Sequence, residues 1–384
     1  MSSNTINDPV VLLRNTENEP SIENTKEEPK LSLFDQYLTL WILLTMLIGT
    51  LLGVYIPGLR NTLDVSKIAN VSLPVFIGLL LMLYPVFCKV KYEHLGTMLS
   101  HKTAIPYLSF SALMNVVICP LFMIALAWAT LFDLPNFREG VILIGIARCI
   151  AMVLIWNDLA GGDAEWAAIL VACNSILQLI LFSPMMYIFV GLLGGGTQYS
   201  ADIGLVAKSV GLFLGIPFFA GILTRVLVVN VIRKPLSWYH EKFIPWVAPL
   251  APIGLIFTIL VMFGLQGKLI VDQIGLCFRV TIPLLIYFPA TFLSTMFVCR
   301  LLGFTYEVAL AMSFTSASNN FELAMAVSIP TFGIDSQQSL STSIGPLIEV
   351  PVMLALVKLC PLVKKYYLGN TSEGTQLSSI EKEN

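Results

Sequence analysis

The chain has 384 residues, of which 56% are hydrophobic and only 12% are charged, and its formal net charge is −2. Soluble domains carry charges on roughly a quarter of their residues, so this composition leaves too little polar surface to face water. It also excludes the basic footprint of a nucleic-acid-binding protein. We therefore expect a protein that lies in a lipid bilayer and has no nucleic acid among its partners.

The chain opens with a polar segment, residues 1–36, whose composition predicts a disordered tail. Uncharged stretches follow, each close to or above the roughly 18–20 residues that a helix needs to cross hydrocarbon. They are residues 37–57, 71–88, 103–132, 166–201, 243–267 and 280–299. Others reach spanning length when one or two interior charges are admitted, at 140–162, 205–228, 305–330 and 338–363. The fold class predicted is an all-α polytopic membrane protein of about ten transmembrane helices, with a second disordered tail at 366–384.

The distribution of lysine and arginine predicts the orientation, because these residues are enriched in cytoplasmic loops. An even number of spans places both termini on one side of the membrane. That side collects fifteen of the 22 basic residues and the other side six, while Arg148 falls within a span. Both termini are therefore expected in the cytoplasm.

The two halves of the chain overlay when one is shifted by 171 residues. This shift places the five spans predicted in residues 37–195 on the five predicted in residues 196–365. Because five is odd, the halves cross the membrane in opposite directions, which is typical of transporters with a substrate site near mid-membrane between the repeats. Evenly spaced apolar segments can also overlay by chance, and the sequence leaves that alternative open.

Polar residues align under the same shift, Arg148 with Asn319 and Gln178 with Glu349. The fourth and ninth spans are also the two that carry polar residues near their middle, around Arg148 and at 315–322. We therefore predict that both helices are broken and that unwound backbone at their centres lines a cavity. Such backbone is tolerated at membrane depth only where protein or water covers it.

Arg148, Glu322 and Glu349 are the only charges deep inside the predicted spans. Charges are costly in a bilayer and commonly mark a substrate or ion pathway, in which carboxylates relay protons. Glu322, beside two asparagines, is the candidate for proton exchange. The alternative is a buried Arg–Glu ion pair that only locks two helices together.

Cys149 stands beside Arg148 in the fourth span. A thiol next to a cation and near helix N-termini is reactive, and sulfur binds soft metals and metalloids. The alternative is that Cys149 packs as a small hydrophobic side chain. The seven cysteines include no CxxC pair, so we expect neither a disulfide framework nor a zinc site, and we expect no cofactor.

Asn174 and Gln178 lie one turn apart on one face of the fifth span. Their amides can donate hydrogen bonds to hydroxyl groups and accept bonds from them. The alternative is that they hold neighbouring helices together. Trp156 of the fourth span is expected either to line the cavity or to pack in the protein.

Three segments resemble a known family, the arsenical-resistance-3 type arsenite permeases. They are Gly145–Asp163 (GIARCIAMVLIWNDLAGGD), which is similar to the family's fourth-helix motif, Ala317–Ala324 (ASNNFELA) and Gly345–Pro351 (GPLIEVP). They occur in the order and at the spacing of the family, and the resemblance extends over about residues 35–365. The family belongs to the bile-acid, arsenite and riboflavin transporter superfamily, whose ten-helix inverted fold agrees with the repeat.

The resemblance implies export of arsenite, with antimonite as a further candidate, from the cytoplasm by proton antiport, and so a transporter rather than an enzyme. It implies that Cys149 is the essential thiol and that Glu322 is the essential, proton-coupling carboxylate. The supporting substrate-binding residues are Arg148, Asn174, Trp156, Asn320 and Glu349, and the residue pattern adds Gln178. Helices 3–5 and 8–10 would form a moving core, and helices 1, 2, 6 and 7 a panel.

Other functions stay open. A sodium-coupled symporter of an organic anion would share the fold, and it would not depend on Cys149. A membrane enzyme or metalloid sensor would need a reactive constellation at the membrane boundary, whereas His94, His101 and His240 fall in predicted loops. The plasma membrane is the expected location, with the vacuolar membrane as the alternative.

Overall fold

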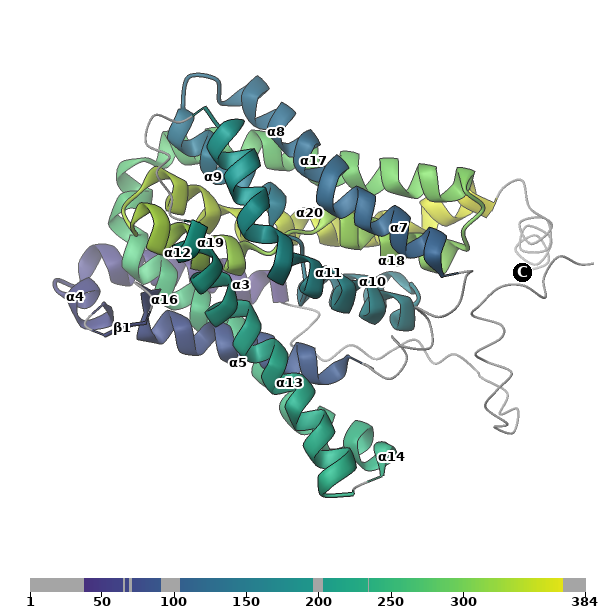
Figure 1. Cartoon of the computed structure of the whole chain (residues 1–384). Helices are drawn as coiled ribbons and strands as arrows, with labels where there is room; N and C mark the ends of the chain where they lie inside the picture. Colours follow the sequence, from purple (N-terminus) through teal and green to yellow (C-terminus); the bar gives the residue numbers. More distant parts are fainter. Residues whose placement is uncertain are drawn as a thin grey trace, which may run out of the picture.

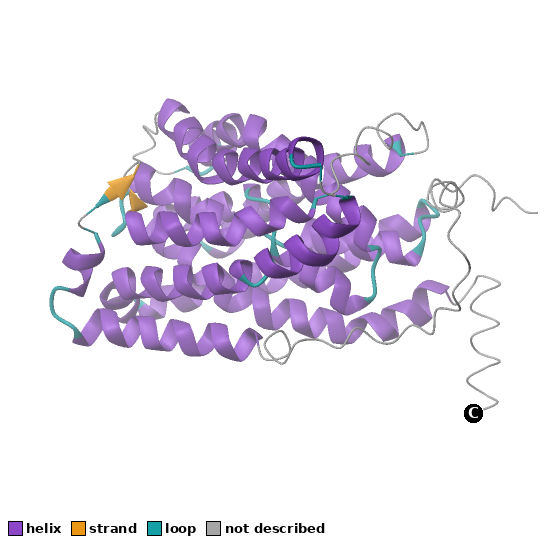
Figure 2. Ribbon diagram, turned by 90° about the horizontal axis from the view of Figure 1, so that it is seen from below, coloured by secondary structure: helices purple, strands orange, loops and turns teal. Residues whose placement is uncertain are grey.

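The computed structural model describes residues 38–64, 66–68, 71–90, 104–195, 203–233 and 235–368. The tail predicted at 1–36 lies outside these residues. The tail predicted at 366–384 also lies outside them, except for its first three residues, which belong to a helix that ends at Leu368. Apart from one hairpin, β1 (Lys67–Ile68) with β2 (Val71–Ser72), the described secondary structure is helical (Figure 2).

Among the described residues, six helical runs are long and apolar enough to cross a membrane. They are α7–η2–α8 (Ile105–Leu113, Met114–Ile118, Cys119–Thr130), α11–η3 (Ala164–Met185, Met186–Leu192), α12–η4–α13–η5 (Ile203–Val210, Gly211–Gly215, Ile216–Val226, Leu227–Val231), α14–η6–α15–α16 (Leu236–Trp238, Tyr239–Phe243, Ile244–Val247, Leu250–Asp272), α17 (Ile274–Leu301) and α20 (Gln337–Leu368). The η segments are π-helical turns. Shorter apolar helices are α3 (Leu38–Tyr55), α5 (Leu73–Lys89) and α19 (Phe321–Phe332). The chain is therefore an all-α polytopic membrane protein, as the sequence predicts.

The helices fall into two groups (Figure 1). In the small bundle, α16 contacts α3 and α5, and α5 also contacts α13. The large bundle consists of α8, α9 (Pro135–Ile146), α10 (Met152–Ala160), α11, α17, α18 (Tyr306–Ala317), α19 and α20. The two bundles meet where α12 contacts α11 and α19 and where α3 and α16 contact α20.

The small bundle packs through glycines, where helix backbones approach closely. A Cβ added at Gly49 of α3 would lie 2.8 Å from the carbonyl oxygen of Leu260 in α16. One added at Gly254 of α16 would lie 2.6 Å from the amide nitrogen of Met82 in α5. Larger residues at these positions would therefore push α16 away from its neighbours.

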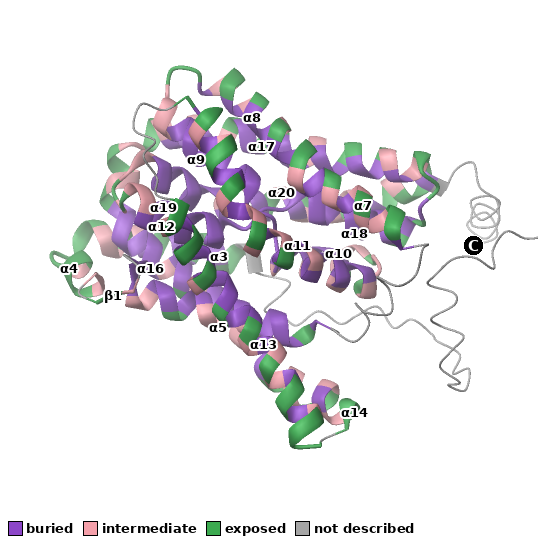
Figure 3. Ribbon diagram, viewed as in Figure 1, coloured by how far each residue is buried: buried purple, intermediate pink, exposed green. Residues whose placement is uncertain are grey.

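The outside of the molecule is apolar, as a surface solvated by lipid must be. Large apolar side chains such as Leu47 of α3, Phe219 of α13 and Phe278 of α17 are exposed. Buried residues gather in the interior of the large bundle, whereas the α13–α14 end that projects from the molecule is mostly exposed (Figure 3). Continuous helices are stable in a bilayer because they satisfy their own backbone hydrogen bonds.

Two helices are broken, at the two predicted places. α9 ends at Ile146, and α10 (Met152–Ala160) begins after the non-helical residues 147–151. α18 ends at Ala317, and α19 begins after residues 318–320. α10 itself ends on Gly161 at φ 71°, the left-handed conformation that glycine adopts at helix C-termini. The unwound segments bring polar backbone into the interior of the large bundle.

Candidate functional site

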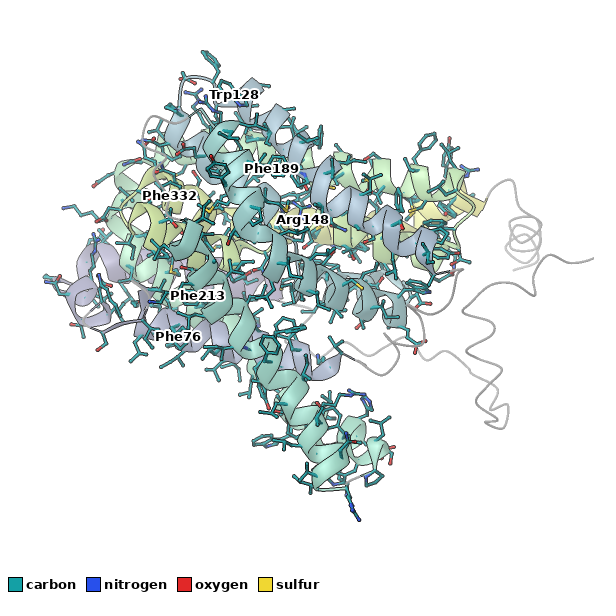
Figure 4. The ribbon with its side chains drawn as sticks, viewed as in Figure 1. Phe76, Trp128, Arg148, Phe189, Phe213 and Phe332 are labelled. Atoms are coloured by element: carbon teal, nitrogen blue, oxygen red, sulfur yellow. The ribbon has the colours of Figure 1, made fainter. Side chains whose placement is uncertain are left out.

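The two unwound segments cross each other and pair as a short antiparallel bridge between Arg148 and Asn319. The Cys149 N–H donates to the Ser318 carbonyl at 3.4 Å, and the Asn320 N–H donates to the Ala147 carbonyl at 2.9 Å. Figure 4 places Arg148 in the interior, midway along the long helices. Each broken helix thus satisfies part of the backbone that the other exposes, as membrane depth requires. We call this pairing the crossing.

Two side chains clamp the crossing. The Gln178 amide of α11 donates to the Arg148 carbonyl at 2.8 Å and accepts from the Arg148 N–H at 3.1 Å. Glu349 of α20 accepts from the Asn319 N–H at 3.2 Å and from the Ser318 hydroxyl. Both side chains are therefore engaged with unwound backbone, and their contact with a substrate stays a prediction.

Removing either clamp should destabilise the protein. We expect Gln178→Leu and Glu349→Leu each to lower the free energy of unfolding by about 1–3 kcal/mol, because a buried backbone N–H loses its acceptor. Glu349→Gln should be milder, since an amide oxygen accepts the same bond, as Gln178 does. Thermal unfolding of the purified variants in detergent measures the difference. A Glu349→Leu variant as stable as the wild type would contradict the clamp.

Arg148 binds the ends of both helices that stop at the crossing. Its guanidinium donates to the carbonyl oxygen of Gly145, in the last turn of α9. It also donates to the carbonyl oxygen of Ser316, in the last turn of α18, at 3.1 Å. It also donates to the Tyr287 hydroxyl of α17 at 2.8 Å. Helix C-termini carry partial negative charge, so this cation lies where two of them meet.

The alternative of a buried Arg–Glu ion pair is not realised. Within the described residues neither Glu322 nor Glu349 forms an ion pair with Arg148. Tyr287 is a partner that the sequence analysis missed. The sequence feature that could have indicated Tyr287 is its position in the uncharged span 280–299, because a buried phenol needs a hydrogen-bond partner.

The Cys149 side chain is buried at the crossing, with 2% of its surface exposed. Its thiol lies close to the Ser318 side chain and to the backbone of Val153, in the first turn of α10. No side chain in the described structure makes a capping hydrogen bond at the N-terminus of α10, so the positive end of this helix lies beside the Cys149 thiol. The Glu349 and Glu322 carboxylates interact electrostatically with the thiol.

Several buried polar atoms at and next to the crossing have no hydrogen-bond partner among the described residues. The donors, called the open donors below, are Arg148 Nε, Trp156 Nε1, Asn174 Nδ2 and Asn320 Nδ2, and one acceptor is Asn319 Oδ1. Asn320 uses its Oδ1 to cap α19 by accepting from the Leu323 N–H at 2.9 Å. Because buried polar groups are almost always satisfied, this set indicates bound water or a bound polar solute.

Glu322 lies in the first turn of α19, directly after the crossing, and is 8% exposed. Glu349 interacts with it electrostatically. The crossing thus unites Arg148, Cys149, Gln178, Asn320, Glu322 and Glu349, all six of them predicted from the sequence. Asn174 lies one turn before Gln178 on α11, and Trp156 lies in α10. No direct bond from either side chain to the crossing is present in the described structure.

This arrangement suits a small neutral solute that carries hydroxyl groups. The open donors can bind its oxygen atoms, Glu322 can accept from a hydroxyl, and the Cys149 thiol can bind a thiophilic atom. In the described part of the chain, no three His, Cys, Asp or Glu side chains group closely enough to hold a metal ion. The chemistry available at the crossing is therefore that of one thiol among hydrogen-bond donors and carboxylates.

Comparison with known proteins gives a consistent family. Residues 76–273 match the model of the Sodium Bile acid symporter family. The chain is 41% identical to the arsenical-resistance protein Acr3 of Corynebacterium glutamicum, over 87% of this chain and 90% of that protein. It is 30% identical to the arsenical-resistance protein Acr3 of Alkaliphilus metalliredigens, over 90% of this chain and 97% of that protein. It is 31% identical to an uncharacterized transporter of Synechocystis, over 90% of this chain and 93% of that protein. The chain therefore belongs to the Acr3-type arsenite permeases, within the sodium bile acid symporter family.

Proposed function

We propose that this protein exports arsenite from the cytoplasm across the plasma membrane in exchange for protons. The observation that carries the proposal is the place of Cys149, a buried thiol at the crossing of two broken helices, where Glu349 binds the crossing backbone and Glu322 begins the next helix. Trivalent arsenic is soft and binds sulfur well. The relatives that match most of this chain and are named by function are arsenical-resistance proteins.

In the proposed cycle arsenite reaches the crossing from the cytoplasm as the neutral trihydroxide. The Cys149 sulfur forms a bond to arsenic, one As–OH bond breaks, and the hydroxide leaves with the thiol proton as water. The open donors of Asn174 and Asn320 bind the remaining oxygen atoms, and Glu322 accepts from a hydroxyl. One thiol holds arsenic less firmly than three would, which suits a carrier that must release its substrate. Antimonite, also a trivalent hydroxide, fits the same chemistry.

Release follows when the large bundle shifts against the small bundle and opens the crossing to the other side. A proton from that side binds Glu322, which can then no longer accept from the substrate hydroxyl. Water displaces arsenic from Cys149 and regenerates both the thiol and the trihydroxide. The proton leaves Glu322 toward the cytoplasm as the carrier returns.

An inverted five-helix repeat, residues 37–195 and 196–365, would allow the large bundle to shift against the small bundle. Under a shift of 171 residues the two backbone bonds of the crossing exchange places, and so do the Gln178 and Glu349 clamps. An antiparallel bridge has a local two-fold axis, which is the symmetry that an inverted repeat needs. In the described part of the chain, counting each broken pair as one span, with the six long runs, α3 and α5, gives ten spans.

The panel and core implied by the family resemblance correspond to the small and large bundles. The excess of basic residues on the side of the termini supports a cytoplasmic location for both ends. We propose the plasma membrane over the vacuolar membrane because the Acr3 relatives are bacterial, and bacteria have no vacuole.

Everted membrane vesicles test the coupling. With an acidic lumen, wild-type vesicles should accumulate arsenite, because protons leave the lumen as arsenite enters it. A protonophore should abolish the accumulation, and a sodium gradient of the same size should not replace the pH gradient. Vesicles without the transporter provide the background. Uptake of an organic anion driven by sodium, with no arsenite movement in a pH gradient, would reject the proposal.

A further inference from the structure

A cavity with both polar and apolar walls lies at the far end of α19 from the crossing. It has a volume of about 230 Å³, and its lining includes Asp64, Lys67, Ser72, Ile329, Gly333 and Ile334. Its walls come from α5, α16 and the hairpin on one side and from α19 on the other, so it lies where the small and large bundles meet. Since a water molecule occupies about 30 Å³ in the liquid, the cavity has room for a small hydroxylated solute with water around it.

The lining contains a buried polar group without a partner. Ser72 of β2 is 3% exposed, and its hydroxyl has no hydrogen-bond partner among the described residues. Nearby, Gln266 donates from Nε2 to the Ile334 carbonyl at 3.1 Å, and its Oε1 has no partner in the same part of the chain. Buried hydroxyl and amide groups are rarely left in this state unless water or a ligand binds them.

The charges of the cavity neutralise each other. Lys67 and Asp64 form an ion pair at 2.7 Å, so the lining presents no unpaired charge that would select an anion or a cation. The Ser72 hydroxyl is the polar side-chain group of the lining that remains to recognise the occupant, and the Gln266 amide bonds to the lining residue Ile334. The lining therefore suits a small neutral solute that Ser72 can bind through a hydroxyl group.

The cavity lies on the same face of α19 as the proton-coupling candidate. Glu322, Met325, Ile329 and Gly333 follow at spacings of three, four and four residues, which places them on one face of the helix. Ile329 and Gly333 line the cavity, and seven residues of helix separate Glu322 from Ile329, roughly 10 Å. Met325, 4% exposed, fills the turn between them, and its sulfur accepts from the Ser343 hydroxyl at 3.4 Å.

Two contacts join the bundles beside the cavity. Arg60 of α4 (Leu59–Leu63) pairs with Asp335 at 2.6 Å, and Gln266 binds Ile334 as described above. Both contacts link the small bundle and its hairpin to the segment between α19 and α20. A shift of one bundle against the other would break them and move Met325 relative to the cavity wall.

We propose that this cavity is a second, transient binding site, which receives neutral arsenic trihydroxide after it leaves the crossing and holds it through the Ser72 hydroxyl. The inference rests on the proposed function, and with both termini in the cytoplasm it places the cavity on the outer side. Met325 separates the two sites in the closed state. Arsenite then moves along one face of α19, from Cys149 past Glu322 and Met325 to Ser72.

Thiol labelling tests the site. In right-side-out vesicles loaded with arsenite, a Ser72→Cys variant should react with a charged, membrane-impermeant methanethiosulfonate added outside, and arsenite efflux should then fall at least about tenfold. External arsenite should slow the reaction several-fold by occupying the cavity. Thr62→Cys is the matched control, because Thr62 is exposed on α4 and does not line the cavity. It should react without loss of efflux and without protection by arsenite, which rules out direct binding of arsenic to a free thiol as the cause of protection.

The outcomes separate the two proposals. Modification of Ser72→Cys with unchanged efflux, or with no protection by arsenite, would overturn the second site. So would a Ser72→Cys thiol that stays unmodified while Thr62→Cys reacts. Ile329→Cys, on the opposite wall, serves the same purpose if Ser72→Cys does not fold. Absence of arsenite efflux from untreated wild-type vesicles would instead reject the proposed function.

Discussion

Cys149→Ala is expected to reduce arsenite transport at least about 100-fold, which corresponds to roughly 2.7 kcal/mol, while the protein remains folded. Among the described residues of the two unwound segments, Cys149 carries the thiol that can bond to arsenic itself, whereas the surrounding donors bind oxygen. The fold should tolerate the change, because the Cys149 N–H, not its sulfur, pairs with Ser318 in the crossing. Initial rates of arsenite uptake into everted vesicles, divided by the amount of transporter, measure the loss.

Cys299→Ala is the matched control, since it removes an equally buried thiol from α17. It should transport within about twofold of the wild type, as a small change in packing does not alter the substrate bond. Cys149→Ser should be as inactive as Cys149→Ala, because a hydroxyl keeps the size but not the affinity for arsenic. If Cys149→Ala transports as well as Cys299→Ala, the thiol is not the arsenic ligand.

The sequence predicted the broken helices because their cause is local. A span with an arginine or several amides near its middle cannot remain a regular lipid-facing helix, and Arg148 and Asn319 mark both breaks. The apolar spans could also be predicted from the sequence, since length and composition alone identify membrane helices. Their grouping into two bundles depends on contacts between distant spans and needed the structure.

The partners of the site residues were not readable from the sequence. The sequence places the polar side chain of Gln178 on one face of a helix. Whether its amide binds a substrate or the protein backbone depends on the position of the crossing, which only the structure gives. Arg148 was expected beside Cys149, yet its direction is set by two helix C-termini and by Tyr287, which lies 139 residues away.

The ends of the spans were also imprecise. The fourth span was predicted to start at residue 140, so the buried charges just before it were not considered. Arg138 donates to the Gly194 carbonyl at 2.7 Å and lies over the Trp128 ring, and Glu139 accepts from Gln338 at 2.8 Å. Charged groups can lie at the end of a span when neighbouring loops and helices supply hydrogen-bond partners. These partners belong to other segments, so the sequence of one span does not identify them.

Glu322→Gln is expected to abolish arsenite accumulation in a pH gradient while it preserves exchange of arsenite for arsenite. Glutamine has the length of glutamate and can still bind a hydroxyl, so the substrate should enter and leave the crossing. An amide cannot take up or release a proton, so the energy of the gradient no longer reaches the carrier. Accumulation should fall to the level of vesicles without transporter, and counterflow in vesicles preloaded with arsenite should stay within about threefold of the wild type.

Glu349→Gln distinguishes the two carboxylates of the crossing. Glu349 accepts bonds from the Asn319 N–H and the Ser318 hydroxyl, and an amide oxygen can take over that acceptance. Glu322 sits in the first turn of α19 with no ion pair among the described residues, on the helix face that leads to the outer cavity. We therefore expect Glu349→Gln to retain gradient-driven accumulation. Should Glu349→Gln lose accumulation while Glu322→Gln keeps it, the proton would be carried by the residue that holds the crossing together, and coupling would act through the crossing itself.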